Sequence, residues 1–186
     1  LSVMQINKSF NLGIFEAGIS MPNEMDNLAE IINADIGLFL NIGTAHAENF
    51  ANINQKIKEK LQLFKSVKTL IFCRDYGEIT ENIFQHQLFR SKNLIYWSRT
   101  NKDAHLYIEK IHSSANKSVV YCVYNNEKFS LKIPFSDYAS VENAINSSLL
   151  LLYLNYNIDI INKRLSKLSQ VAMRLELKKG INNCSI

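Results

Sequence analysis

Residues 38–64 read LFLNIGTAHAENFANINQKIKEKLQLF, and this stretch decides the fold. An apolar run ends in Asn-Ile-Gly, His46 follows shortly after, and a lysine-rich stretch with helical periodicity comes next. The run over residues 36–43 is too continuously apolar for a half-exposed strand, which predicts a central strand of a parallel sheet. A buried strand that leads directly into a helix is typical of a β-α-β unit.

Strand and helix patterns alternate through the first hundred residues. Asn52 and Gln55 have the spacing of a capping box, which places a helix start there. The strand patterns cover residues 12–18, 36–43, 69–75 and 93–99, and the helix patterns cover residues 23–33, 52–64 and 79–89. Met25, Leu28, Ile31 and Ile32 fall on one side of the first of these helices. Strict alternation predicts right-handed βαβ units and therefore an α/β fold with a parallel sheet.

The rhythm changes over residues 104–135. Three strand-like stretches follow each other there, and Asn125-Asn126 forms a turn signal between the last two. This pattern predicts a small antiparallel β insert. Ser140 is then expected to cap a long apolar helix that runs to about Tyr153, and residues 158–171 predict another helix.

Composition excludes several classes of protein. Of the 186 residues, 47% are apolar and 20% charged, which is typical of a globular chain. No apolar run reaches the roughly 18 residues that span a bilayer, so we expect no membrane segment. The formal charge is +4 and the basic residues are scattered, which argues against a nucleic-acid partner. The three cysteines form no C-x-x-C pair, so we expect reduced cysteines in a cytoplasmic protein.

Two polar residues lie at the predicted carboxyl ends of strands. Glu16 lies near the end of the strand pattern 12–18, and His46 lies just past the pattern 36–43. Ligands of parallel sheets gather at this edge, where a carboxylate and a neutral imidazole suit a cation that carries phosphates. Each residue also has a simpler interpretation. Glu16 is equally suited to capping a helix, and His46 to an ordinary loop position.

The helix pattern after His46 contains a lysine in an unusual position. At about 100° per residue, Lys60 falls near the edge of the apolar stripe, whereas Lys56 lies outside its flank. The stripe consists of Ile53, Ile57, Leu61 and Phe64. Partial burial lowers the pKa of an amine, and a neutral amine can act as a nucleophile or react with carbon dioxide. The alternative is that Lys60 extends along its own stem to water.

Taken together, these motifs resemble the ATP-binding domain of the Mur ligases. The stretch FEAGISMPNEMDNL at residues 15–28 carries Glu-x-Gly and a variant of Pro-Gly-Glu-Ile. Asn-Ile-Gly-x-Ala-His follows at residues 41–46, and Lys-x-x-x-Phe at residues 60–64. The similarity continues at residues 140–154 and 171–186, so it covers most of the chain apart from the insert.

The resemblance implies roles for five residues. Glu16 and His46 match the family's magnesium ligands, and Lys60 matches the lysine whose carbamate helps to hold a second magnesium ion. Asn143 matches the first asparagine of the adenine motif, and Arg174 the arginine that reaches the nucleotide. Two positions depart from the pattern. Glu142 replaces the adenine motif's histidine, which puts that contact in doubt, and Asn23 replaces the glycine of Pro-Gly-Glu.

The resemblance also implies an organisation. Residues 1–170 are expected to form most of the central ATP-binding domain, and residues 171–186 the hinge and the start of a C-terminal ligase domain. The P-loop pattern G-x-x-x-x-G-K-[ST] occurs nowhere in the chain. We therefore expect the P-loop upstream of Leu1, and we expect the 186 residues alone to be inactive and to bind ATP very weakly.

Within the family, the chain is most similar to ligases that add D-alanyl-D-alanine to UDP-N-acetylmuramoyl-tripeptide. That similarity implies ATP, Mg²⁺ and these two substrates, with ligation through an acyl phosphate. The residue patterns of several stretches are most similar to a version of this ligase that is fused to an alanine racemase. The alternatives are another Mur-type ligase, such as one resembling folylpolyglutamate synthetase, and a non-catalytic nucleotide-binding module.

Overall fold

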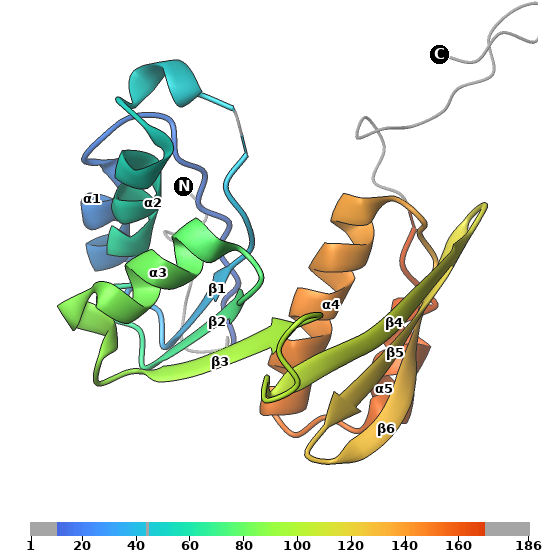
Figure 1. Cartoon of the computed structure of the whole chain (residues 1–186). Helices are drawn as coiled ribbons and strands as arrows, with labels where there is room; N and C mark the ends of the chain where they lie inside the picture. Colours follow the sequence, from blue (N-terminus) through green and yellow to red (C-terminus); the bar gives the residue numbers. More distant parts are fainter. Residues whose placement is uncertain (1–10, 44, 170–186) are drawn as a thin grey trace, which may run out of the picture. The chain divides into compact units, whose positions relative to one another are not determined.

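The structure is a computed structural model that describes residues 11–43 and 45–169. In this part, the chain divides into two compact units (Figure 1). The first contains the helices and strands that precede His105, and the second begins at Leu106. Among the described helices, none is long and apolar enough to cross a membrane.

The first unit contains three parallel strands, β1 (Ile36–Phe39), β2 (Thr69–Cys73) and β3 (Asn93–Ser98). They pair in the order β1-β2-β3, with Ile36 opposite Thr69 and Thr69 opposite Asn93. Between them lie the helices α2 (Ile53–Gln62) and α3 (Gly77–Gln85) and the short 3-10 turns η2 (Ala47–Asn49) and η3 (Gln87–Phe89). The predicted parallel α/β fold is confirmed.

The prediction that residues 36–43 form a central strand is only half right. They contain β1 in a parallel sheet, but the described residues give β1 one partner, β2. It is β2 that lies between two strands, and all five of its residues are buried. The alternating burial of β1 agrees with its outer position.

The strand predicted at residues 12–18 is not formed among the described residues. This segment is irregular, and Leu12 and Ile14 are 71% and 86% exposed. A β-strand needs a neighbouring strand to accept and donate its backbone hydrogen bonds, and no described strand pairs with these residues. The strand-like pattern of these residues was therefore not sufficient to predict a strand.

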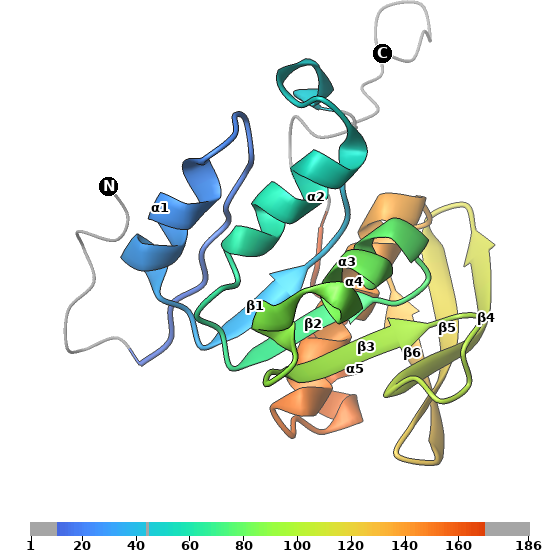
Figure 2. The ribbon, with the colours of Figure 1, turned by 60° about the vertical axis from the view of Figure 1, so that its left-hand side comes forward.

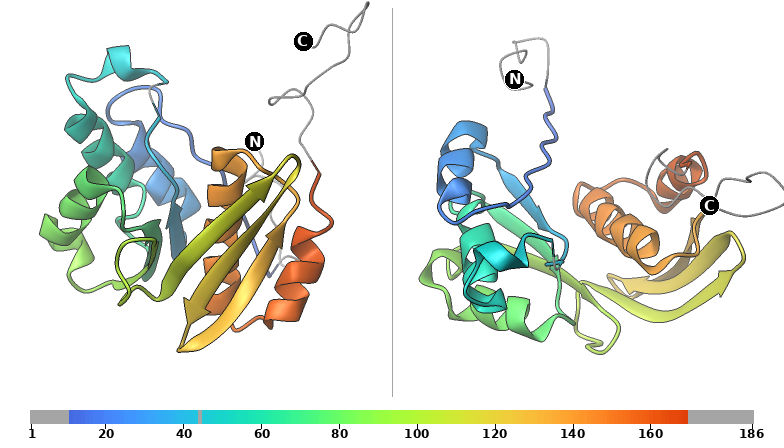
Figure 3. Two further views of the ribbon diagram at one scale, coloured as in Figure 1. Left: turned by 45° about the vertical axis from the view of Figure 1, so that its right-hand side comes forward. Right: turned by 90° about the horizontal axis from the view of Figure 1, so that it is seen from above.

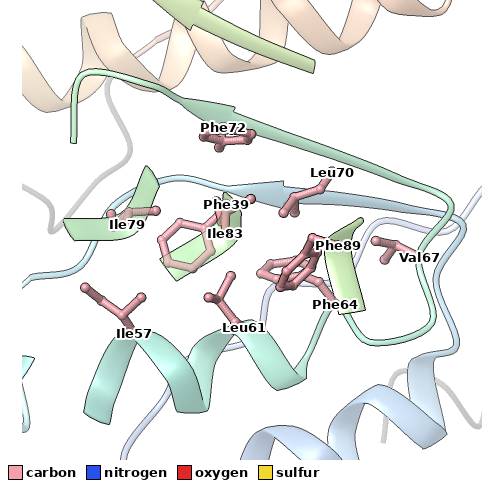
Figure 4. Close-up of a cluster of buried hydrophobic side chains, with 10 residues drawn as sticks. All are labelled: Phe39, Ile57, Leu61, Phe64, Val67, Leu70, Phe72, Ile79, Ile83 and Phe89. Carbon is pink, nitrogen blue, oxygen red and sulfur yellow. The ribbon is translucent and has the colours of Figure 1, made fainter. Parts of the chain in front are cut away.

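The hydrophobic core of the first unit lies between one face of the sheet and the helices α2 and α3 (Figure 4). Phe39, Leu70 and Phe72 project from the strands toward Ile57 and Leu61 of α2. Burying side chains of this size contributes about 1.5–3 kcal/mol each. The predicted stripe on α2 is confirmed for Ile57, Leu61 and Phe64, whereas Ile53 remains 39% exposed. Ile53 is the first residue of the helix, where the chain has only begun to turn toward the sheet.

Helix α1 (Glu24–Ile32) lies beside α2 (Figure 2). Its buried face consists of Met25 and Ala29, and Met25 packs in a small cluster with Ile19 and Phe50. The prediction that Ile31 shares this face is wrong, because Ile31 is 61% exposed. The spacing of four residues from Met25 to Ala29 defines the face instead.

The second unit contains an antiparallel sheet of β4 (Leu106–Ser114), β5 (Lys117–Tyr124) and β6 (Glu127–Ile133). Asn125 and Asn126 connect β5 to β6 with φ values of 50° and 65°, the conformation of a tight hairpin turn. The helices α4 (Tyr138–Tyr153) and α5 (Ile158–Leu165) lie on one face of this sheet (Figure 3). The predicted antiparallel strands are confirmed.

The start of α4 differs from the prediction by three residues. The cap is Asp137, whose carboxylate accepts a hydrogen bond from the Ser140 backbone N–H at 2.9 Å. Ser140 is therefore the third residue of the helix and donates to the cap. Aspartate and serine are both favoured at this position, so the residue type of Ser140 was not sufficient to place the cap.

Candidate functional site

The loop that leaves β1 carries the Asn-Ile-Gly-x-Ala-His motif. His46 is exposed, and its backbone has φ 57° and ψ 23°, in the left-handed region. This conformation is uncommon for residues other than glycine, although histidine tolerates it better than most. The loop and α2, the next helix, together position the residues that the sequence singles out.

Lys60 lies on α2 and faces the end of β1. Its Nζ donates a hydrogen bond to the Asn41 carbonyl oxygen at 3.2 Å and lies 5.3 Å from the centroid of the Phe39 ring. Burial lowers the pKa of the Lys60 ammonium, and the nearby charge of Lys56 lowers it further. The predicted partial burial of Lys60 is confirmed. Its catalytic role remains a prediction.

Lys56 is placed differently from the prediction. Its side chain is buried, with a residue exposure of 3%, rather than lying outside the stripe. Its Nζ donates to the carbonyl oxygens of Gly43, at 2.8 Å, and of Ala45. The helical wheel identifies only the face of α2 that packs on the sheet, so it did not predict that Lys56 is buried. The loop after β1 covers a second face of α2, and Lys56 lies beneath it. The four-residue spacing to Lys60 was the available signal, because it puts both amines on one face.

The carboxylate on which the charge of His46 acts is that of Glu24. The pKa of Glu24 is lowered by backbone hydrogen bonds from Met21 and Ser20, at 2.9 and 2.8 Å, and also by the charge of His46. Glu24 belongs to the Pro-Gly-Glu-like segment, which was noted as a motif but not as a neighbour of His46. Glu16 is exposed in the irregular segment before α1.

The described residues contain no cluster of three or more His, Cys, Asp or Glu side chains that could hold a metal ion. In the metal site that the resemblance implies, the carbamate of Lys60 would join Glu16 and His46 as a ligand. This combination remains a prediction.

The predicted adenine motif lies on α4 of the second unit. Asn143 is exposed, as a ligand contact requires. Glu142, which stands in place of the adenine motif's histidine, is buried. It lies in the second turn of α4, on the face that packs inward, next to the fully buried Asn146, whose Nδ2 donates to the Glu142 carbonyl oxygen at 3.1 Å. Arg174 and the predicted hinge at residues 171–186 lie outside the described residues.

Two surface hollows lie away from these residues. One, of about 420 Å³, is on the outer side of α2 and is lined by Asn52, Asn54, Gln55, Lys58, Glu59 and Gln62. The other, of about 400 Å³, lies in the second unit, around the β5–β6 turn and the start of α5. Neither is lined by Lys60 or His46, so the chemistry of the side chains, and not these hollows, indicates the site.

Comparison with known families decides the assignment. The model of the Mur ligase middle domain matches residues 2–151, which is most of the chain. The chain belongs to the Mur ligase family. The predicted resemblance of the chain to the Mur ligases is thereby confirmed.

Among curated Mur ligases, the chain is similar to UDP-N-acetylmuramoyl-tripeptide–D-alanyl-D-alanine ligases. It is 24% identical over 181 residues to that of Buchnera aphidicola subspecies Acyrthosiphon pisum, covering 95% of this chain and 39% of the relative. It is 24% identical over 189 residues to that of Bacillus subtilis, covering 100% of this chain and 39% of the relative. The chain thus spans about two fifths of the length of these relatives.

Solved Mur ligase structures share the fold. MurF from Acinetobacter baumannii matches with a TM-score of 0.73 and 18% identity, over 89% of this chain and 36% of that one. MurF from Thermotoga maritima in complex with ADP matches with a TM-score of 0.69 and 18% identity, over 86% and 36%.

Proposed function

We propose that the protein containing this chain is a cytoplasmic, ATP-dependent amide ligase of peptidoglycan precursor synthesis. It would join D-alanyl-D-alanine to UDP-N-acetylmuramoyl-tripeptide. The observation that carries the proposal is the setting of Lys60, a partly buried amine tied to the loop that presents His46. The names of the curated relatives support the choice of substrates.

The reaction joins a carboxylate to an amine in two steps. A terminal carboxylate oxygen of the tripeptide attacks the γ-phosphorus of ATP, the bond to the β–γ bridging oxygen breaks, and ADP leaves. The amine of D-alanyl-D-alanine then attacks the acyl carbon, the bond to the phosphate oxygen breaks, and the amine releases a proton to solvent. Both steps require that anionic groups approach each other, so positioning and charge stabilisation supply most of the catalysis.

The residues of this chain would supply a metal site. The neutral Lys60 amine forms a bond to the carbon of CO₂ and loses a proton, which leaves a carbamate anion. Glu16, His46 and this carbamate would hold magnesium, which screens the repulsion between the attacking carboxylate and the triphosphate. The lowered pKa of Lys60 suits this modification because only the neutral amine reacts. On α4, the exposed Asn143 is available for adenine, and Arg174 would contact the nucleotide.

The substrate assignment is tested with the whole protein. The protein should release phosphate when it is given ATP, Mg²⁺, UDP-N-acetylmuramoyl-tripeptide and D-alanyl-D-alanine. Omission of either the tripeptide substrate or D-alanyl-D-alanine should abolish the release. Turnover with a folate or a single amino acid instead, and none with these substrates, would favour another Mur-type ligase.

The competing proposal is that the chain is a nucleotide-binding module without catalysis. The affinity of the chain for magnesium-ATP distinguishes this proposal from the ligase. In the domain assignment we propose, residues 1–170 supply only part of the ATP site, and residues 171–186 begin the next domain. Isothermal titration of the 186-residue chain with magnesium-ATP should then give very weak binding. Micromolar binding would favour the module. A fused alanine racemase is a separate proposal, which the neighbouring coding sequence tests.

A further inference from the structure

Lys56 is a buried cation without a carboxylate partner in the part of the chain that the structure describes. Burying a charge is costly unless hydrogen bonds offset the lost hydration. An apolar residue of similar size would fill the same space on α2 without that cost. A lysine at this position therefore indicates that its hydrogen bonds serve a purpose beyond packing.

Among the described residues, the hydrogen bonds of the Lys56 side chain go to the loop that carries His46. Its Nζ donates to the carbonyl oxygens of Gly43 and Ala45, and Ala45 directly precedes His46. The same Nζ lies 5.8 Å from the centroid of the Phe50 ring, on the other side of His46 in the chain. Lys56 thus contacts the chain both before and after His46.

The backbone of His46 needs such support. Its left-handed conformation is sparsely populated by non-glycine residues and persists only where the surroundings hold it. The following turn is short, with backbone hydrogen bonds from Asn49 to His46 and from Phe50 to Ala47, each 3.2 Å long. Phe50 is in turn packed against Met25 of α1, so the far end of the turn is also anchored.

We propose that Lys56 is a positioning residue, whose buried ammonium holds residues 45–50 in place and so sets where His46 is presented. The inference that this placement serves metal binding rests on the proposed function. The inference that Lys56 holds the loop in place does not depend on the proposed function. Lys60, whose Nζ donates a hydrogen bond to the Asn41 carbonyl oxygen, holds the start of the same loop. Each lysine therefore anchors a different part of the loop.

Amide hydrogen exchange on the whole protein tests the hold on the loop. Lys56→Met keeps most of the length of the side chain and removes its donors. Lys58 is an exposed lysine on the same helix, so Lys58→Met is the matched control. In Lys56→Met, exchange of the Asn49 and Phe50 amides should rise about tenfold or more, while amides of β2 keep their rates. Lys58→Met should change neither.

Either of two exchange results would overturn the inference. One is unchanged exchange at Asn49 and Phe50, and the other is a uniform rise that includes β2, which would make Lys56 a general support of the core. If Lys56→Met does not fold, Lys56→Gln takes its place with the same expectation. If neither folds while Lys58→Met does, the inference is also wrong, because Lys56 then stabilises the whole unit.

Paramagnetic broadening by Mn²⁺ separates this inference from the proposed function. In the whole protein with a non-hydrolysable ATP analogue, Mn²⁺ should broaden the ring signals of His46, which is one of the four histidines in these 186 residues. Lys56→Met should require about tenfold more Mn²⁺ for the same broadening. Equal broadening in the variant would overturn the role of Lys56 in presenting His46. No broadening in the unmodified protein would contradict the proposed metal site. The exchange experiment would then decide by itself whether Lys56 holds the loop in place.

Discussion

The Lys60 ammonium donates a hydrogen bond to the Asn41 carbonyl oxygen at 3.2 Å, which ties the last turn of α2 to the loop just after β1. The amine is thereby held at the carboxyl edge of the sheet, where parallel sheets bind their ligands. Its surroundings also lower its pKa, chiefly through burial. Position and protonation thus both favour a chemical role for this lysine.

Substitution of Lys60 tests that role. In the whole protein, Lys60→Ala should reduce ligation by about a hundredfold or more, because the anion that stabilises the transition state is lost. Added acetate or another short carboxylate should partly restore the rate, since it can occupy the position of the carbamate. Lys58→Ala, at an exposed position of the same helix, should leave the rate unchanged. A normal rate for Lys60→Ala would mean that Lys60 simply extends to water.

The close approach of Phe64 to Gly37 predicts a packing defect. A Cβ atom on Gly37 would overlap Cδ1 of the Phe64 ring and lie 2.9 Å from its Cε1. Gly37→Ala should therefore lower the free energy of unfolding by about 1–3 kcal/mol, as overpacked cores do. Gly77→Ala, where a Cβ meets no atom within 4 Å, is the control. Chemical denaturation measures both, and equal stability of the two variants would show that Phe64 moves aside freely.

The hydrogen bonds of Asp75 lead us to expect that the free energy of unfolding depends on pH. Its carboxylate accepts hydrogen bonds from the Ser98 hydroxyl, the Thr100 hydroxyl at 2.9 Å and the Arg99 backbone N–H at 2.8 Å. Burial acts to raise the pKa of Asp75, but these hydrogen bonds outweigh it and hold the pKa below its ordinary value of 3.8. The stabilisation is therefore complete above pH 3.8 and is lost as the pH falls through the lower pKa of the folded state.

Asp75→Asn should cost about 1–3 kcal/mol near neutral pH, because one oxygen acceptor becomes a donor. The loss should shrink as the pH falls below 3.8, where Asp75 itself becomes protonated. Asp103→Asn, at an exposed position nearby, should change little. Urea unfolding of the variants at several pH values measures this, and a cost for Asp75→Asn that stays constant down to pH 2 would contradict it.

Much of the fold follows from the sequence because local patterns and tertiary structure agree. The alternation of β1, α2, β2, α3 and β3 was predictable, as was the asparagine turn between β5 and β6. Residues 12–18 show where this reasoning fails. Their pattern suits a strand, but strand formation depends on a partner that the local sequence does not specify.

The candidate site was predictable in part for a similar reason. A helical wheel placed Lys60 at the edge of the buried face, because that edge depends only on the position of the sheet. Lys56 and Glu24 were missed because their surroundings come from chain segments that a single helix pattern does not reveal. The loop after β1 buries Lys56, and the charge of His46 acts on Glu24.

The central claim is that Glu16, His46 and Lys60 together hold magnesium for the attack on ATP. A crystal structure of the whole protein with Mg²⁺, bicarbonate and a non-hydrolysable ATP analogue tests it most directly. The account predicts a carbamate on Lys60 and metal ions about 2.1 Å from ligand atoms of these three side chains. Magnesium bound elsewhere, or the three side chains too far apart to share a pair of ions, would contradict it.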